Sequence, residues 1–161
     1  MVARLKDNRH AETKLWHVAI LRIFFGYYFF QDGLGKLTGG FTGPGVLEKW
    51  LTTKADAAFD WYKPFLTGVL IPHHQLVAGL ITWGMILAGL TLLCGLLTRP
   101  AALVGIFMTL NFYLAKGGGS PATTSDQAFM AGLLVVFLAR AGRAYGLDGW
   151  LARRYPGSPL W

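Results

Sequence analysis

The 161-residue chain is 53% hydrophobic and only 14% charged, whereas a soluble domain carries about 25% charged residues. Its net charge of +7 raises the question of nucleic-acid binding. We expect no nucleic-acid partner, because the basic residues flank apolar segments and form no single stripe with interleaved aromatic residues. The single cysteine, Cys94, excludes an internal disulfide, a CxxC redox pair and a CxxCH haem attachment.

Four apolar stretches follow one another along the chain, and each predicts a membrane-spanning helix. They cover residues 15–37, 71–97, 100–116 and 124–141. A spanning helix needs about 20 apolar residues, which the first two stretches supply. The last two are shorter and need flanking Arg and Lys side chains that reach toward the headgroups. The sequence therefore predicts an all-α membrane protein, a four-transmembrane-helix bundle in a single integral membrane domain over residues 1–161. A soluble helical bundle is the alternative.

The distribution of basic residues predicts the orientation in the membrane. With the N-terminus in the cytoplasm, nine basic residues lie on the inner side, five lie on the outer side, and Arg22 lies within the first span. The excess on the inner side follows the positive-inside rule. The first apolar stretch is longer than the core of a signal peptide, and no A-x-A cleavage site follows it. We expect an uncleaved first span, both termini in the cytoplasm and a cytoplasmic tail over residues 142–161.

The segment between the first two spans, residues 38–70, is a long amphipathic loop that we expect on the extracytoplasmic side. Leu47, Trp50 and Leu51 share one face at helical spacing. An aromatic cluster follows them and consists of Phe59, Trp61, Tyr62 and Phe65. Two interpretations stand: an interfacial helix with an aromatic belt at headgroup level, or a cap over the outer mouth of the bundle.

Charged residues and glycines share one stripe of the first predicted helix. On a helical wheel, the stripe falls within about 120° and contains Arg22, Gly26, Asp32, Gly33 and Lys36. Charges inside membranes usually face protein or water, so we expect this stripe to face the bundle. Asp32 and Lys36 are four residues apart and can form a local ion pair, with Lys36 reaching outward to the headgroups as the alternative.

Arg22 lies deep in the first span, where it is a structural membrane charge that needs a partner. The apolar cores of the later stretches, the last of which covers residues 127–139, contain no carboxylate. The candidate partners are hydroxyls such as those of Thr91 or Thr109, backbone carbonyls, a lipid phosphate or another subunit.

Further polar residues are predicted at the outer end of the spans, and their chemistry suits a quinone headgroup. Such a headgroup needs hydrogen bonds to two carbonyl oxygens and proton exchange. The candidate catalytic residues, as proton handlers, are Asp32, His73 and His74. The candidate binding residues are Gln31, Lys36, Asn111 and Tyr113. The alternative is that the two histidines are simply solvated at the membrane surface.

The sequence predicts neither haem nor metal. His17 lies at the inner end of the first span, whereas His73 and His74 lie at the outer end of the second. They are separated by most of the membrane thickness, about 30 Å, so an internal bis-histidine haem is not expected. No zinc-ligand spacing is present.

Several segments, in this order, resemble the DoxX/DoxD family, and within it the DoxD-like small subunit of thiosulfate:quinone oxidoreductase. They are "LRIFFGYYFFQDGLGKL", "WYKPFLTGVLIPHHQ", "GMILAGLTLLCGLLTRPAALVG", "NFYLAKGG" and "ARAGRAYGLDGWLARRYP". The resemblance implies a four-helix membrane protein of a prokaryotic inner membrane. It also implies quinone reduction linked to oxidation of sulfur compounds, with a partner subunit. The family commonly carries a glutamate four residues before the glycine that aligns with Gly89, and this chain has Met85 there.

Two functions follow as hypotheses. The first is a quinone-interacting membrane subunit of a thiosulfate:quinone-type oxidoreductase that receives its electrons from a partner. The second is a non-catalytic accessory subunit packed in the bilayer against a larger respiratory or photosynthetic complex. Met85 and the lone Cys94 favour the second hypothesis.

Overall fold

The computed structural model describes residues 16–119 and 121–155, and this part of the chain contains seven α-helices and no strand. The long helices are α2 (Trp16–Thr38), α5 (His74–Cys94), α6 (Thr98–Lys116) and α7 (Pro121–Leu138). The shorter ones are α3 (Val46–Ala55), α4 (Lys63–Phe65) and α8 (Leu147–Arg154), with a π-helical turn η2 (Leu66–Leu70) and a 3₁₀ turn η3 (Ala141–Arg143). The all-α prediction is confirmed, and the four long helices overlap the four apolar stretches.

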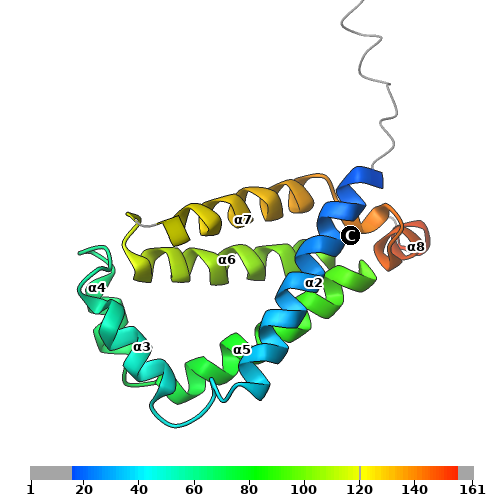
Figure 1. Cartoon of the computed structure of the whole chain (residues 1–161). Coiled ribbons are helices and arrows are strands. Elements are labelled where there is room, and N and C mark those ends of the chain that lie inside the picture. The colour runs from blue at the N-terminus through cyan, green and yellow to red at the C-terminus, as the bar shows by residue number, and fades with distance from the viewer. Residues whose placement is uncertain (1–15, 120, 156–161) are drawn as a thin grey trace, which may run out of the picture.

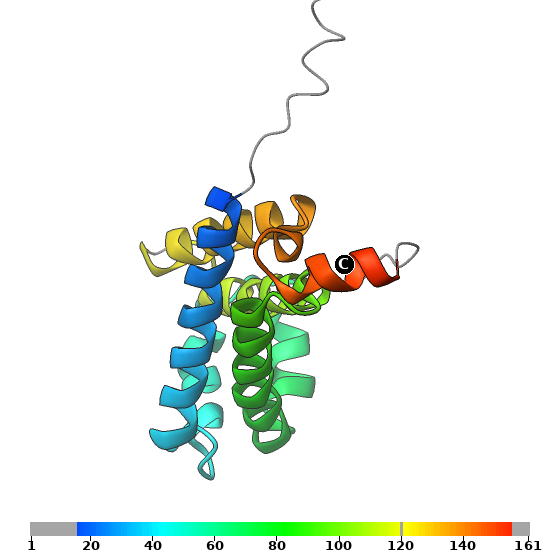
Figure 2. The ribbon, with the colours of Figure 1, turned by 90° about the vertical axis from the view of Figure 1, so that its right-hand side faces the viewer.

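The long helices form two pairs that diverge like the limbs of a V (Figure 1). α2 packs on α5, and α6 packs on α7. At the closed end of the V, the start of α2 and the end of α5 meet the start of α6 and the end of α7, and α8 packs there as well (Figures 1 and 2). At the open end, α3 and α4 lie across the gap between the two pairs (Figure 1). The expected bundle is therefore splayed, with its amphipathic loop across the opening.

A short connection between α5 and α6 forms the apex of the V. Gly95 ends α5 in the left-handed conformation with φ 65°, which glycine adopts without steric cost. Leu97, also left-handed with φ 51°, precedes α6. Asp148 of α8 caps the start of α6, because its carboxylate oxygens accept hydrogen bonds from the backbone N–H groups of Leu97 at 2.7 Å and Thr98 at 2.9 Å. The predicted tail, residues 142–161, thus contributes to the closed end through its described part.

The interface between α2 and α5 confirms the predicted orientation of α2. Arg22, Gly26 and Gly33 are buried. A Cβ on Gly26 would lie 2.7 Å from the backbone nitrogen of Leu93, and one on Gly33 would lie 2.9 Å from that of Ile86. The two backbones therefore approach as closely as small residues allow. The opposite face of α2 exposes large hydrophobic side chains, namely Ile20, Ile23, Phe24, Tyr27 and Leu34.

The loop over residues 38–70 packs onto the open end as a cap. In α3, Leu47 and Leu51 are buried in a cluster with Leu66 and Ala115. The backbone N–H of Phe59 donates to the carbonyl oxygen of Leu114 at 3.4 Å. These contacts favour the cap interpretation of the loop. Its extracytoplasmic location stays a prediction.

Only α5, among the helices of residues 16–119 and 121–155, is both long and apolar enough to cross a membrane by length and composition. Spanning by α2, α6 and α7 stays a prediction, and so does the orientation. Residues 1–15, which carry four of the nine predicted inner basic residues, and residues 156–161 lie outside the described residues.

Candidate functional site

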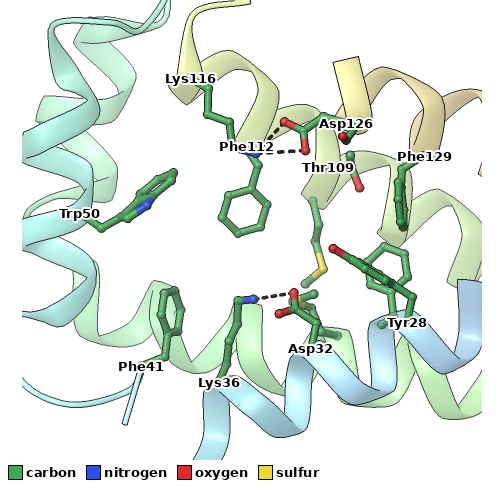
Figure 3. A pocket seen from close by; sticks show the side chains of 14 residues that line it. Tyr28, Asp32, Lys36, Phe41, Trp50, Thr109, Phe112, Lys116, Asp126 and Phe129 are labelled. Carbon is green, nitrogen blue, oxygen red and sulfur yellow. Dashed lines mark hydrogen bonds and ion pairs between the residues drawn. The ribbon is translucent and has the colours of Figure 1, made fainter. Parts of the chain in front are cut away.

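A polar cavity of about 370 Å³ lies between the two limbs of the V at the open end. Side chains from α2, α3, α5, α6 and α7 and from the loop after α2 line it (Figure 3). Its charged lining residues are Asp32, Lys36, Lys116 and Asp126. The cavity thus joins residues that are far apart in sequence, and the cap helix α3 contributes Trp50 to its wall.

Two ion pairs carry the charge of this cavity. Lys36 Nζ lies 2.5 Å from Asp32 Oδ2 within α2. Lys116 Nζ, at the end of α6, contacts both carboxylate oxygens of Asp126 on α7, at 2.8 and 3.1 Å. Figure 3 shows the pairs on opposite sides of the cavity. Because two lysines face two aspartates, the lining carries no net charge.

Aromatic and sulfur-containing side chains form the rest of the wall. Tyr28 packs against Phe129 with ring centroids 4.4 Å apart, and Trp50 meets Phe112 edge to face at 5.9 Å. The ammonium of Lys36 lies 5.7 Å from the ring centroid of Phe41, within cation–π range. The remaining lining residues are Phe29, Met85, Met108, Thr109 and Ser125. Planar apolar rings with a few fixed polar groups are typical of a small-molecule site.

The sequence prediction placed seven polar residues around one site, and the cavity contains two of them. Asp32 and Lys36 line it. Gln31 is exposed on α2, and His73 is exposed before α5. His74 Nδ1 lies 2.9 Å from the Ile71 carbonyl oxygen and 3.8 Å from the Glu48 carboxylate. Neither Gln31 nor either histidine lines this cavity, because the residues share a level along the helices but face different directions.

The other two predicted residues also lie outside the polar cavity. Tyr113 points toward Phe59 with ring centroids 5.8 Å apart, and its hydroxyl accepts a hydrogen bond from Gln127 at 3.3 Å. Asn111 Oδ1 accepts a hydrogen bond from the Tyr62 hydroxyl at 2.7 Å and lines a second, apolar cavity. Burial raises the pKa of Tyr62 above its ordinary value, so its hydroxyl stays protonated and continues to donate.

At the closed end, Arg22 is buried with 1% of its surface exposed. Its guanidinium donates to the carbonyl oxygens of Ala141 at 3.3 Å, Ala144 at 3.4 Å and Tyr145 at 3.3 Å. Backbone carbonyls, one of the four predicted alternatives, are therefore its partners. The hydroxyls of Thr91 and Thr109 instead bond within their own helices. Arg22 thus fastens the segment after α7 to α2.

The family of the chain follows from a match over the larger part of its length. The DoxX family model matches residues 17–116, which include α2, the cap, α5 and α6. The chain belongs to the DoxX family. No solved structure shows a significant match to it.

The DoxX match ends at Lys116, so it contains one partner of the second ion pair and stops before the other. Asp126, the carbonyl partners of Arg22 and the capping Asp148 all lie beyond it. The sequence prediction missed Asp126 as a site residue because a loop separates it from Lys116. A signal existed: it is the only carboxylate at the start of the fourth apolar stretch.

Met85 occupies the position where the DoxX/DoxD resemblance implies a glutamate. It lines the polar cavity and is 3% exposed. Gly33 packs against it, and Gly33 follows Arg22 by eleven residues, or roughly 16 Å along the helix. An acid at this position would face the cavity and would not reach Arg22. The replacement of the glutamate by Met85 therefore changes the chemistry of the cavity lining, but it does not deprive Arg22 of a partner.

The remaining groups of the described chain offer no metal site. Residues 16–119 and 121–155 contain no cluster of three or more His, Cys, Asp or Glu side chains that could hold a metal ion. The prediction that the protein uses no metal or haem remains a prediction.

Proposed function

We propose that this DoxX-family chain is a quinone-interacting membrane subunit of a thiosulfate:quinone-type oxidoreductase. The observation that carries the proposal is the polar cavity at the open end, with an ion pair on each of two sides and aromatic rings between them. A quinone headgroup is neutral, planar and bears two carbonyl acceptors.

A location in the bilayer is supported by the surface of the long helices. Each exposes large hydrophobic side chains, for example Phe24 on α2, Leu80 on α5, Phe107 on α6 and Leu138 on α7. Soluble monomers rarely expose apolar surface on this scale. The positive-inside distribution supports cytoplasmic termini and a cavity near the outer face.

The cavity residues fit the headgroup in charge and in shape. Lys36 and Lys116 are hydrogen-bond donors that approach from different limbs of the V, so each can donate to one carbonyl oxygen. Tyr28, Trp50 and Phe112 offer ring faces or edges to a planar ligand. Because each lysine already has a carboxylate partner, the cavity lacks the surplus positive charge that a thiosulfate anion would require. We therefore place sulfur oxidation on a partner subunit.

Proton supply follows from the exposure of the two pairs. A bound quinone supplies the acceptor for two electrons and two protons, and the electrons would come from the partner. The Asp32 side chain is 40% exposed and the Lys36 side chain 18%, so this pair lies between water and the cavity. The Lys116–Asp126 pair is more enclosed, with side chains 22% and 15% exposed. It is suited to orient the headgroup.

A binding titration tests the proposal. The purified protein in a mild detergent is titrated with decylubiquinone by isothermal calorimetry. The double variant Asp32→Asn/Lys36→Gln removes one ion pair without leaving a lone charge, and we expect its affinity to fall about tenfold, or 1.4 kcal/mol. The matched control is His73→Gln/His74→Gln, which changes two predicted residues outside the cavity and should bind as the wild type does. If the Asp32→Asn/Lys36→Gln variant binds decylubiquinone as tightly as the control and the wild type do, the cavity is rejected as the site.

The accessory-subunit function is the second candidate, and Met85 is the observation that favours it. A thioether in the cavity can neither donate nor accept a proton in a redox reaction. This candidate predicts copurification at fixed stoichiometry with a larger membrane complex and no heat of quinone binding in the same titration.

A further inference from the structure

A second cavity, which we call the apolar groove, lies between α5 and α6 beneath the cap, and it also measures about 370 Å³. Leucine, isoleucine, valine and aromatic side chains dominate its lining. The polar atoms of two lining residues are occupied: the Tyr62 hydroxyl donates to Asn111 Oδ1 at 2.7 Å, and Asn111 Nδ2 donates to the Phe107 carbonyl oxygen at 2.7 Å. The groove therefore suits hydrocarbon and offers little to a polar ligand.

The apolar groove and the polar cavity share a wall. Trp50, Met108 and Phe112 line both of them. Figure 3 shows the Trp50 and Phe112 side chains at the edge of the polar cavity. Methionine has three rotatable bonds and adapts its shape, so Met108 can move with little strain. The two cavities therefore adjoin at these three residues.

The apolar groove also reaches the surface of the molecule. Leu80 on α5 and Phe107 on α6 line it, and they are 63% and 67% exposed. Both belong to the exposed apolar surface that the proposed function places against lipid. A chain in the groove would therefore have the bilayer at one end and the polar cavity at the other.

We infer that the apolar groove holds the hydrocarbon tail of the same quinone whose headgroup lies in the polar cavity. This inference rests on the proposed function and adds the substrate class, a quinone with a prenyl-type chain. The shared wall of Trp50, Met108 and Phe112 identifies the occupant, because a tail attached to a headgroup in the polar cavity reaches the groove directly. The tail leaves toward lipid between Leu80 and Phe107.

Gly84 provides a way to fill the groove from a position outside the polar cavity, although Met108, the side chain that it would crowd, lines both cavities. It lines the groove and is absent from the lining of the polar cavity. A Cβ at this position would overlap the end of the Met108 side chain, so Gly84→Leu fills groove volume and crowds Met108. The matched control is Gly79→Leu on the same helix, because a Cβ at Gly79 meets open space and Gly79 lines neither cavity.

Two probes that share a headgroup and differ in their tail measure how much the tail contributes to the affinity. The first is 2,3-dimethoxy-5-methyl-1,4-benzoquinone, which has no tail, and the second is decylubiquinone, which adds a ten-carbon chain. Both are titrated into the full-length protein at one detergent concentration. In the wild type and in Gly79→Leu, we expect decylubiquinone to bind at least about tenfold tighter, because its chain is buried. In Gly84→Leu this ratio should fall by about fivefold or more, whereas the affinity for the tail-less probe should stay within about twofold.

The outcomes distinguish the inference from the proposed function. If the tail-less probe binds and Gly84→Leu leaves the ratio at its wild-type value, the headgroup site stands and the inference is overturned, with a lipid acyl chain as the occupant that remains. If neither probe binds the wild type, the proposed function and the inference both fail. Should Gly84→Leu not fold by circular dichroism, Val104→Trp, which also lines the groove, replaces it with the same expected result.

Discussion

The two ends of the V use charged residues in opposite ways. At the closed end, Arg22 and Asp148 are each 1% exposed, and both are bonded to backbone groups of other segments. At the open end, the lysines and aspartates bond to one another and keep part of their surface free. Buried charges that are bonded to the backbone of other segments fasten a structure, whereas paired, partly exposed charges around a cavity can change partners when a ligand arrives. This difference separates a structural end from the end where we propose that the ligand binds.

The largest expected effect comes from Arg22→Met at the closed end. This change removes the side-chain hydrogen bonds to the carbonyl oxygens of Ala141, Ala144 and Tyr145 and the positive charge near Asp148. We expect the free energy of unfolding to fall by about 3 kcal/mol, measured by denaturant titration in detergent micelles. Arg140→Met, an exposed arginine at the same end, is the control and should change stability by less than about 0.5 kcal/mol. Equal stability of the two variants would show that Arg22 does not fasten the closed end.

A smaller loss is expected for Asp148→Ala. The variant leaves the backbone N–H groups of Leu97 and Thr98 at the start of α6 without an acceptor. Loss of such a cap costs about 1–2 kcal/mol, and Asp148→Asn, which keeps one acceptor oxygen, should recover part of it. Quinone affinity should stay within about twofold, since the cavity lies at the other end. A large loss of affinity with intact folding would mean that the two ends are coupled.

The opposite pattern is expected at the open end. The double variant Lys116→Gln/Asp126→Asn removes the second ion pair without leaving a lone charge. We expect decylubiquinone affinity to fall about tenfold and the free energy of unfolding to change by less than about 1 kcal/mol. Calorimetry and denaturant titration on the same preparation measure both quantities. If this variant loses stability but binds decylubiquinone normally, the Lys116–Asp126 pair has a structural role and does not contribute to binding.

The smallest effect is expected for the exposed pair of Asp60 and Lys63 in the loop. The hydrogen bond from Lys63, 2.8 Å long, holds the pKa of Asp60 below its ordinary value of 3.8. A lowered pKa in the folded state stabilises the protein above the ordinary pKa and loses that contribution as the pH falls through the folded value. Because the pair is exposed, solvent screens it, so Asp60→Asn should unfold as the wild type does at pH 7 and also at pH 3. A difference at pH 7 that vanishes at pH 3 would assign this loop pair a structural role.

Helix positions and the inward face of α2 could be predicted from the sequence, because periodicity specifies which residues share a face. Arg22, Gly26 and Gly33 were placed correctly for this reason. The V could not be predicted, since it depends on the left-handed residues Gly95 and Leu97 between α5 and α6. No hydrophobic pattern encodes that turn.

The site was predicted less completely for a related reason. Hydropathy predicts the depth of a residue along the membrane normal. The direction in which its side chain points depends on how the helices pack against one another. Asp32 and Lys36 lie on the inward stripe and line the cavity, whereas His74 turns toward Glu48 on the cap. The guanidinium of Arg22 donates hydrogen bonds to backbone carbonyl oxygens. Because every residue has a backbone carbonyl, the sequence could not identify the three that accept these bonds.

Photoaffinity labelling locates the bound quinone headgroup in the chain. An azido-substituted benzoquinone is bound to the purified protein, activated by light and located by mass spectrometry of peptides. We expect labels on the cavity segments Tyr28–Lys36, Met108–Lys116 and Ser125–Phe129, and decylubiquinone should compete with them. Competed labels confined to His73–Gln75 or to the closed end around Arg22 would show that the headgroup does not bind in the polar cavity.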